Sequence, residues 1–438
     1  MYPLLTNSIK QVRYQPLYSD FKIEYGDRLY PLAVNETAEQ IMLLSNGVNS
    51  IEKIHAHLSN MYQEDLSVVR DLVSEFLENA IRYNHISLIN DPLVEAKNIE
   101  VYGSRDYWTP TLLTIELTDM CPLNCKHCYV SKNKKLMMDE DLIKKIIYQI
   151  KSLKIEQVQL TGGEPLLHPH FFEILTELIN AGVFVHVFTS GFVYDQNIIN
   201  RFDEFDKRKL LIQVSIDGLK HYHDAFRRKS GSFERAIEFL KLMNSNGFNT
   251  VVGLTVIDQP YEELSELCDL CELIGVNTLR IGAVSSRGEA KESNLMRTIE
   301  ETEYVLNMKK RLAKNKSSEH FKVALSDSDE INNNSLYSKN CGWGQIILKV
   351  SAEGNVYPCP LSDLLIGNLK VSTIENILKE KSRLFEQIEI PNQSICNKCE
   401  SEILCSNCVI EAILYSEKYN SCQWLKKNAT LIQQITGE

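Results

Sequence analysis

From residue 111 to about residue 315, the chain alternates strand-like and helical segments six times. Short apolar runs such as "TLLTIELT" and "LLIQVSIDG" are each followed by a segment with apolar residues at helical spacing. A parallel pair of strands needs a crossover connection, usually a helix. The alternation therefore predicts an α/β core, with a parallel sheet and helices outside it.

Four chemically distinctive segments follow the first four predicted strands. They are a cysteine loop at 121–128, Gly162-Gly163-Glu164, Ser190-Gly191 and Asp217-Gly218. In α/β folds of this kind, the chemistry sits at the carboxyl ends of the parallel strands. We therefore expect these four segments to converge on one site.

The 438 residues exceed the usual size of one domain, so two or three units are expected. Residues 1–95 contain strands, three amphipathic helical stretches and a closing strand. Residues 96–110 are polar and without clear period, which predicts a linker. The core then spans 111–315, and a cysteine-rich end spans 316–438.

The net charge of −11 and the lack of a basic run argue against a nucleic acid partner. No apolar run approaches the ~18 residues of a membrane helix, so no membrane partner is expected. The N-terminus lacks the basic start and apolar stretch of a signal peptide. These features predict a cytoplasmic protein.

The stretch "CPLNCKHCY" contains Cys121, Cys125 and Cys128. In a reducing compartment, clustered cysteines favour metal binding or catalysis over disulfides. A cubane iron–sulfur cluster usually takes four cysteines, so three leave one iron open. One alternative is a zinc site with His127 as the fourth ligand. Because His127 directly precedes Cys128, binding of one metal ion by both residues would be strained. The other alternative is three buried cysteines without a metal.

This motif, at the start of a strand–helix alternation, resembles the radical S-adenosylmethionine (SAM) superfamily. The resemblance implies a partial (βα)6 TIM-like barrel and a [4Fe–4S] cluster on the three cysteines. It also implies SAM chelated at the open iron by its amino and carboxylate groups. Electron transfer, from a flavodoxin- or ferredoxin-type donor, cleaves SAM to a 5′-deoxyadenosyl radical that abstracts hydrogen from the substrate. The reactive chemistry belongs to the cofactor.

The same resemblance implies a set of SAM contacts. "TGGEP" would meet the methionyl amino group, "VSIDG" the methionyl or ribose part, and Arg227 the carboxylate, while His127 would lie beside the adenine. Each segment also has a purely structural interpretation, as a turn or a solvated face. The predicted contacts are His127, Gly162, Gly163, Glu164, Ser190, Ser215, Asp217 and Arg227.

Seven cysteines near the C-terminus resemble the auxiliary-cluster extension called SPASM. The resemblance implies one cluster on Cys396, Cys399, Cys405 and Cys422, and another on Cys341, Cys359 and Cys408. Together with the cluster implied for the 121–128 loop, the resemblance implies three [4Fe–4S] clusters. Two Cys-x2-Cys pairs also suit a zinc ribbon on Cys396, Cys399, Cys405 and Cys408. The three-cysteine set suggests an open iron or an unusual ligand.

Cys268 and Cys271 stand apart from these groups, within the helical stretch "YEELSELCDLCELIG". Their spacing of three places them near one helix face. Free cysteine behaves as a small hydrophobic residue, so both are expected to pack in the core.

Residues ~20–92 resemble the small peptide-binding chaperone of pyrroloquinoline quinone biosynthesis, with "LAVNETAEQIMLLSNG" the most similar stretch. The resemblance implies a winged-helix-like domain that captures a leader peptide as an added strand on a sheet edge. The alternative is a generic winged-helix module, including one that binds DNA. The acidic balance and the lack of a basic recognition helix argue against DNA.

A leader-binding domain, a radical core and auxiliary clusters together imply an enzyme that modifies a ribosomally made precursor peptide. "VSIDG", "RIGAVSSRGEA" and "NCGWGQIILKVSAEGNVYPC" resemble the sactipeptide maturases, which join a cysteine sulfur to an α-carbon. Rival outcomes on the same architecture are a carbon–carbon crosslink, as in streptide-type peptides, and a thioether to a β- or γ-carbon. A non-catalytic, zinc-containing peptide-binding protein is the alternative from another class.

Overall fold

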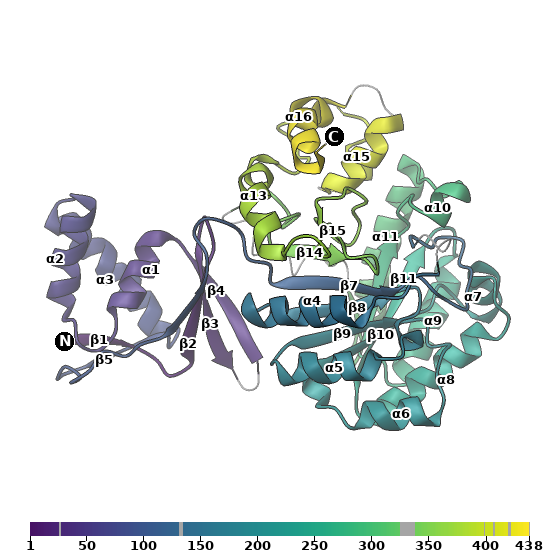
Figure 1. Ribbon diagram of the computed structural model, residues 1–438, viewed down its shortest axis with the longest axis horizontal. Helices are drawn as coiled ribbons and strands as arrows, with labels where there is room; N and C mark the ends of the chain where they lie inside the picture. Colours follow the sequence, from purple (N-terminus) through teal and green to yellow (C-terminus); the bar gives the residue numbers. More distant parts are fainter. Residues whose placement is uncertain are drawn as a thin grey trace. The chain divides into compact units, whose positions relative to one another are not determined.

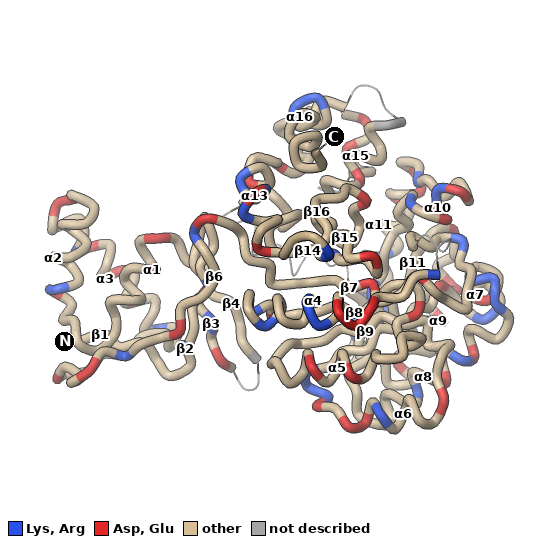
Figure 2. The backbone as a smooth tube through the Cα atoms, in the orientation of Figure 1, with Lys and Arg blue, Asp and Glu red and all other residues tan. Residues whose placement is uncertain are grey.

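The computed structural model describes residues 1–25, 28–130, 135–324, 338–397, 399–405, 408–418 and 422–437. The chain forms two compact units, Met1–Trp108 and Thr109–Glu438 (Figure 1). Of the helices in the described residues, none combines the length and apolar character needed to cross a bilayer. Lys and Arg positions are interspersed with Asp and Glu positions in both units (Figure 2).

The first unit contains two small sheets and three helices. Its elements are β1 (Tyr2–Leu5), β2 (Ile9–Tyr14), β3 (Ser19–Tyr25), β4 (Arg28–Val34), α1 (Glu36–Leu44), α2 (Ile51–Tyr62), α3 (Leu66–Arg82), β5 (Ile86–Ile89) and β6 (Glu100–Gly103). One sheet has the order β4-β3-β2-β6, and β1 pairs with β5. Ile9 and Phe21 of the strands belong to the same buried cluster as Ile54 and Val73 of the helices.

Most of the segment predicted as a linker, residues 96–108 of 96–110, is instead part of the first unit. Its strand β6 pairs in parallel with β2. Arg105 then donates from Nη1 to the carbonyl oxygens of Gln15 and Tyr18, at 2.8 and 3.0 Å. The prediction was wrong because a four-residue edge strand with mostly exposed side chains has no apolar period to reveal it.

The second unit is built on a ten-stranded sheet. Its strands are β7 (Leu112–Thr118), β8 (Gln157–Gly162), β9 (Phe184–Thr189), β10 (Leu210–Ser215), β11 (Asn249–Val256), β12 (Thr278–Ala283), β13 (Lys322–Ala324), β14 (Ile347–Val350), β15 (Asn355–Tyr357) and β16 (Gly367–Asn368). Their order is β13-β12-β11-β10-β9-β8-β7-β14-β15-β16.

The helices of this unit connect and follow those strands. They are α4 (Glu140–Ser152), α5 (Phe171–Asn180), α6 (Gln196–Asp203), α7 (Lys220–Arg227), α8 (Ser232–Ser245), α9 (Tyr261–Leu273), α10 (Glu289–Glu292), α11 (Ile299–Lys316), α13 (Ile374–Gln387), α14 (Glu402–Cys405), α15 (Val409–Lys418) and α16 (Gln423–Thr436), with short 3-10 turns η1 (Pro165–Leu167) and η2 (Lys207–Lys209). Figure 1 shows α4, α5 and α6 outside strands β7 to β10.

The predicted α/β class is confirmed, since β7 to β12 form successive parallel pairs. The sheet continues beyond them on both sides. β13 lies after the six predicted strand–helix units and pairs with β12. β14 comes from the cysteine-rich end and pairs in parallel with β7. The core and the C-terminal end therefore share one sheet, which the separate predicted boundaries did not anticipate.

Helix packing follows the expected pattern. Asp139 caps α4 by accepting from the Leu142 N–H, and α4 then buries Ile146 and Ile150. The strands are apolar where helices cover them, as at Val214 of β10. Burying such a side chain stabilises the fold by about 1.5–3 kcal/mol. This packing fixes the carboxyl ends of the strands, where the candidate site lies.

Candidate functional site

The cysteine loop follows β7 and is held by backbone hydrogen bonds from two helices. The Lys126 N–H donates to the carbonyl of Phe226 near the end of α7, at 3.0 Å. The Glu289 N–H, at the start of α10, donates to the carbonyl of Cys128 at 2.8 Å. These hydrogen bonds attach the loop to α7 and α10.

The two glycines after β8 allow a close approach between backbones. The Gly163 N–H donates to the carbonyl of Thr118 at 2.6 Å. A Cβ on Gly163 would lie 2.3 Å from the carbonyl oxygen of Met120, and Gly162 has φ +123°. Any other residue here would displace the chain that leads into the cysteine loop. The predicted contact with SAM stays a prediction.

Glu164 is fully buried, and protein donors occupy its carboxylate. Oε1 accepts from Thr189 Oγ1 at 2.8 Å and the Leu166 N–H at 3.4 Å. Oε2 accepts from the Ser190 N–H at 2.9 Å and from the Ser190 hydroxyl. A carboxylate has about four acceptor positions, so these donors fill them. In this structure Glu164 therefore joins the end of β8 to the end of β9.

Asp217 and Arg227 form a buried ion pair between the end of β10 and the end of α7. Arg227 donates to Asp217 Oδ2 from Nε at 2.8 Å and from Nη2 at 2.7 Å. The Thr255 N–H donates to Oδ1 at 3.2 Å. Burial opposes ionisation of Asp217, but the charge of Arg227, together with smaller contributions from His127, His223 and the Thr255 N–H, lowers its pKa overall. Both predicted SAM contacts thus have a structural role as well.

Arg227 also links this pair to the cysteine loop. Burial alone would lower the pKa of Arg227, but the charges of Asp217, Cys125 and Cys121 raise it. The guanidinium therefore interacts electrostatically with two of the three loop thiols. Three thiols on one loop with a neighbouring cation are a donor set that fits an iron–sulfur cluster.

The other two predicted contacts lie in the same part of the unit. The His127 ring stacks on Phe226, with centroids 4.7 Å apart and planes at 13°. Phe226 stacks in turn on Tyr222. Ser215 is the last residue of β10, two positions before Asp217. The structure therefore gathers the predicted residues around the carboxyl ends of β7 to β10, as the alternation implied.

Three C-terminal thiols interact electrostatically with one another. Burial raises the pKa of the Cys359 thiol, and the thiols of Cys408 and Cys341 raise it further. Burial likewise raises the pKa of Cys408 to about 12, with a smaller contribution from Cys341. These three are the set that the SPASM resemblance assigned to one cluster.

The remaining four C-terminal thiols form a second set. Burial raises the pKa of Cys405 to about 12, and the thiols of Cys422, Cys399 and Cys396 add to the shift. The zinc-ribbon alternative would place Cys408 here instead of Cys422. Within the described ranges, no three His, Cys, Asp or Glu side chains are arranged to hold a single metal ion. Ligation by either set stays a prediction.

Cys268 and Cys271 lie on the buried side of α9, where they are 1% and 0% exposed. Burial raises the pKa of the Cys268 thiol to about 12. Both behave as core residues, in agreement with the prediction.

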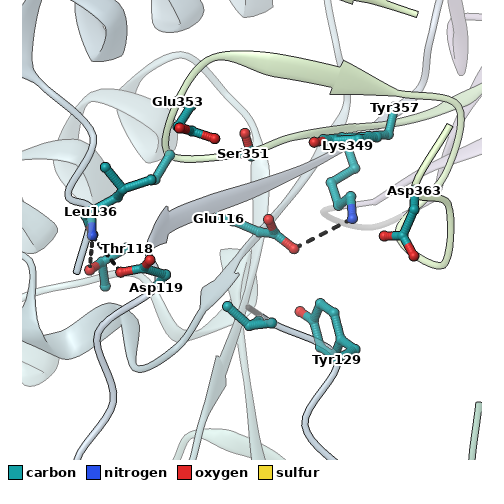
Figure 3. A pocket seen from close by; sticks show the side chains of 12 residues that line it. Glu116, Thr118, Asp119, Tyr129, Leu136, Lys349, Ser351, Glu353, Tyr357 and Asp363 are labelled. Carbon is teal, nitrogen blue, oxygen red and sulfur yellow. Dashed lines mark hydrogen bonds and ion pairs between the residues drawn. The ribbon is translucent and has the colours of Figure 1, made fainter. Parts of the chain in front are cut away.

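A cavity of about 270 Å³ lies beside the cysteine loop and was not foreseen. Glu116 of β7 and Lys349 of β14 project into it, with Nζ and Oε1 3.6 Å apart, and Tyr129 forms another wall (Figure 3). The sequence did contain a signal, since a charged residue interrupts each apolar run, in "TIELT" and "ILKV". No residue predicted to contact SAM lines this cavity.

Two parts of the chain match known protein families. Residues 115–271 match the radical SAM superfamily. Residues 341–400 match the iron–sulfur cluster-binding domain called SPASM. The two domains imply SAM and iron–sulfur clusters as cofactors.

Two curated relatives come from Bacillus subtilis (strain 168). The sporulation killing factor maturation protein is 25% identical over 306 residues, covering 69% of this chain and 73% of the relative. The antilisterial bacteriocin subtilosin biosynthesis protein is 24% identical over 454 residues, covering 97% of this chain and 96% of the relative.

Among solved structures, Streptococcus suis SuiB bound to its precursor peptide SuiA has a similar fold. The TM-score is 0.65 at 13% identity, covering 94% of this chain and 97% of SuiB. Fold, family matches and the position of the cysteine loop agree with one another. The chain therefore carries a radical SAM domain and a SPASM domain.

Proposed function

We propose that this enzyme modifies a ribosomally synthesised precursor peptide and joins a cysteine sulfur of that peptide to an α-carbon. The observation that carries the proposal is the near full-length relation to the subtilosin biosynthesis protein, which spans all predicted parts of the chain. The maturation protein of the sporulation killing factor supports the same class. A fold shared with SuiB, which was solved with a precursor peptide, is consistent with a peptide partner.

Cys121, Cys125 and Cys128 are the residues that would hold the radical SAM cluster. When bound, cluster and SAM supply a 5′-deoxyadenosyl radical that removes a hydrogen atom from the substrate. The protein's part is to hold this site and exclude water. Arg227 contributes positive charge beside the thiols, while Glu164 and the glycines keep β8, β9 and the loop in register.

The two C-terminal thiol sets would hold auxiliary clusters, for three [4Fe–4S] clusters in all. The set of Cys396, Cys399, Cys405 and Cys422 has four thiols and would close its cluster. The set of Cys341, Cys359 and Cys408 has three, which leaves an iron for an exogenous ligand such as a substrate thiolate. A flavodoxin- or ferredoxin-type protein would supply the initiating electron.

The first unit would bind the leader of the precursor peptide. Strand β4 lies at the edge of its four-stranded sheet. Leu29 and Tyr30 of this strand are 53% and 47% exposed. An added peptide strand gains affinity from backbone hydrogen bonds, and exposed apolar side chains add contact area.

The test is mass spectrometry of the short peptide encoded beside this gene after co-expression with the enzyme. Thioether formation predicts loss of two hydrogens per bond and cysteines that no longer react with an alkylating reagent. A matched control is the Cys125→Ala variant, which is expected to leave the peptide unchanged. The same mass loss with all cysteines still alkylatable would identify a carbon–carbon crosslink. An unchanged peptide would count against the proposal.

A further inference from the structure

The cavity beside the cysteine loop is lined by side chains from two adjacent strands. Glu116 and Thr118 of β7 both line it, on either side of an irregularity in the pairing of β7 with β8. Lys349 lies opposite Thr114 in the parallel register of β7 and β14. Glu116 and Lys349 therefore enter the same space from neighbouring strands, next to Tyr129, which directly follows Cys128 (Figure 3).

The ion pair in this cavity has poor geometry for a structural salt bridge. Its atoms are 3.6 Å apart, although the side chains are only 5% and 13% exposed. Charge-assisted hydrogen bonds are usually about 2.7–2.9 Å long. Taking two charges out of water is offset only where the geometry is good. In the neighbouring pair, Arg287 Nε donates to Asp363 Oδ2 at 2.7 Å, and there the Asp363 side chain is 70% exposed.

Two further polar atoms belong to residues that line the same cavity. Asp119 Oδ2 and Ser351 Oγ are buried and have no hydrogen-bond partner among the described residues. Such atoms cost about 1–3 kcal/mol each when nothing satisfies them. A bound group with an N–H and an oxygen, such as a peptide unit, would satisfy both.

We propose that this cavity holds the part of the precursor peptide that carries the reacting thiol, and that Glu116 accepts the proton of that thiol. The step breaks the S–H bond. The proton moves to the carboxylate of Glu116, the sulfur keeps the electron pair, and the ammonium of Lys349 stabilises the resulting thiolate. Asp119 and Ser351 would position the adjoining peptide group. This inference rests on the proposed function and adds its proton acceptor.

The charges around Glu116 suit this role. Burial raises its pKa, and Lys349 and Arg287 partly offset that effect, while Asp363 reinforces it. Burial also lowers the pKa of Lys349. Tyr129 and Tyr357 are the other titratable groups that face Glu116. A carboxylate that takes up a proton more readily than an exposed glutamate is a better base at neutral pH.

The experiment uses the full-length, cluster-loaded enzyme and a precursor peptide with deuterium at the acceptor α-carbon. In Glu116→Gln, deuterium should still transfer to 5′-deoxyadenosine, whereas crosslinking should fall about 10²-fold or more. The acidic limb of the wild-type pH–rate profile should also disappear. The matched control is Glu375→Gln, which changes an exposed glutamate paired with Lys379 at 2.8 Å and should alter neither quantity.

Two results would overturn the inference. One is crosslinking by Glu116→Gln at the wild-type rate across the pH range. The other is equal loss of deuterium transfer and crosslinking, because that indicates a failure before the proton step. If the wild-type enzyme leaves the peptide unmodified, that result contradicts the proposed function itself, on which this inference rests.

The pair is then tested without the peptide. Infrared difference spectra between wild type and Glu116→Gln should contain a carboxylic acid band whose titration moves to higher pH in Lys349→Met. A band that titrates identically in both proteins would overturn the coupling of the two residues.

Discussion

Two polar regions lie close to the cysteine loop and differ in how completely their groups are satisfied. Around Glu164, Asp217 and Arg227, every carboxylate oxygen has a donor within the protein. In the cavity, Glu116 and Lys349 are loosely paired, and Ser351 has a buried hydroxyl without a hydrogen-bond partner within the described ranges. A satisfied network holds strands in place, whereas an unsatisfied one costs stability and is retained where a ligand completes it.

The largest expected effect comes from breaking the satisfied region. Arg227→Met leaves Asp217 buried without its partner, so the free energy of unfolding should fall by about 3–5 kcal/mol. Denaturant unfolding of the purified protein measures this. The control is Arg208→Met, which removes an exposed arginine paired with Asp206 at 3.0 Å and should cost no more than about 1 kcal/mol. Equal losses in the two variants would remove the distinction between buried and exposed pairs.

The pH dependence of the free energy of unfolding tests the satisfied region around Glu164. Burial raises the pKa of Glu164, and hydrogen bonds from Ser190 and Thr189 only partly offset it. The folded state therefore binds more protons than the unfolded state between the ordinary and the raised pKa. Stability should be greatest below the ordinary glutamate pKa and should fall as pH rises through this window. Glu164→Gln should lose that slope while costing about 1–3 kcal/mol in hydrogen bonds. If the slope persists in the variant, it arises from the titration of another group.

The smallest effect is expected in the cavity. Ser351→Ala removes a buried hydroxyl that has no partner in the described structure, so the free energy of unfolding should not fall and should rise by about 1 kcal/mol. Ser232→Ala is the matched control, because the buried Ser232 hydroxyl donates to Asp224 at 2.9 Å. The free energy of unfolding of that variant should fall by about 1 kcal/mol. A larger loss for Ser351 than for Ser232 would show that the cavity is a structural network like the other region.

The sequence alone determined the elements and the clustering of thiols. Apolar periodicity fixes whether a segment suits a strand or a helix, so the six strand–helix units were predictable. Cysteine spacing is also local, and the sets containing Cys359 and Cys405 are the ones that interact in the structure. Strand β6 was not predicted, because it is short and its side chains are mostly exposed.

Only the tertiary structure decided which charged side chains become neighbours. Glu116 and Lys349 come from distant parts of the sequence and become neighbours because β14 joins the sheet beside β7 in one particular register. Asp217 and Arg227 meet because α7 folds back over the end of β10. A shift of one residue in strand register would turn these side chains to the other face, and no local pattern records that choice. The sequence therefore supplies the reactive groups, and long-range pairing decides which are used for structure and which face a cavity.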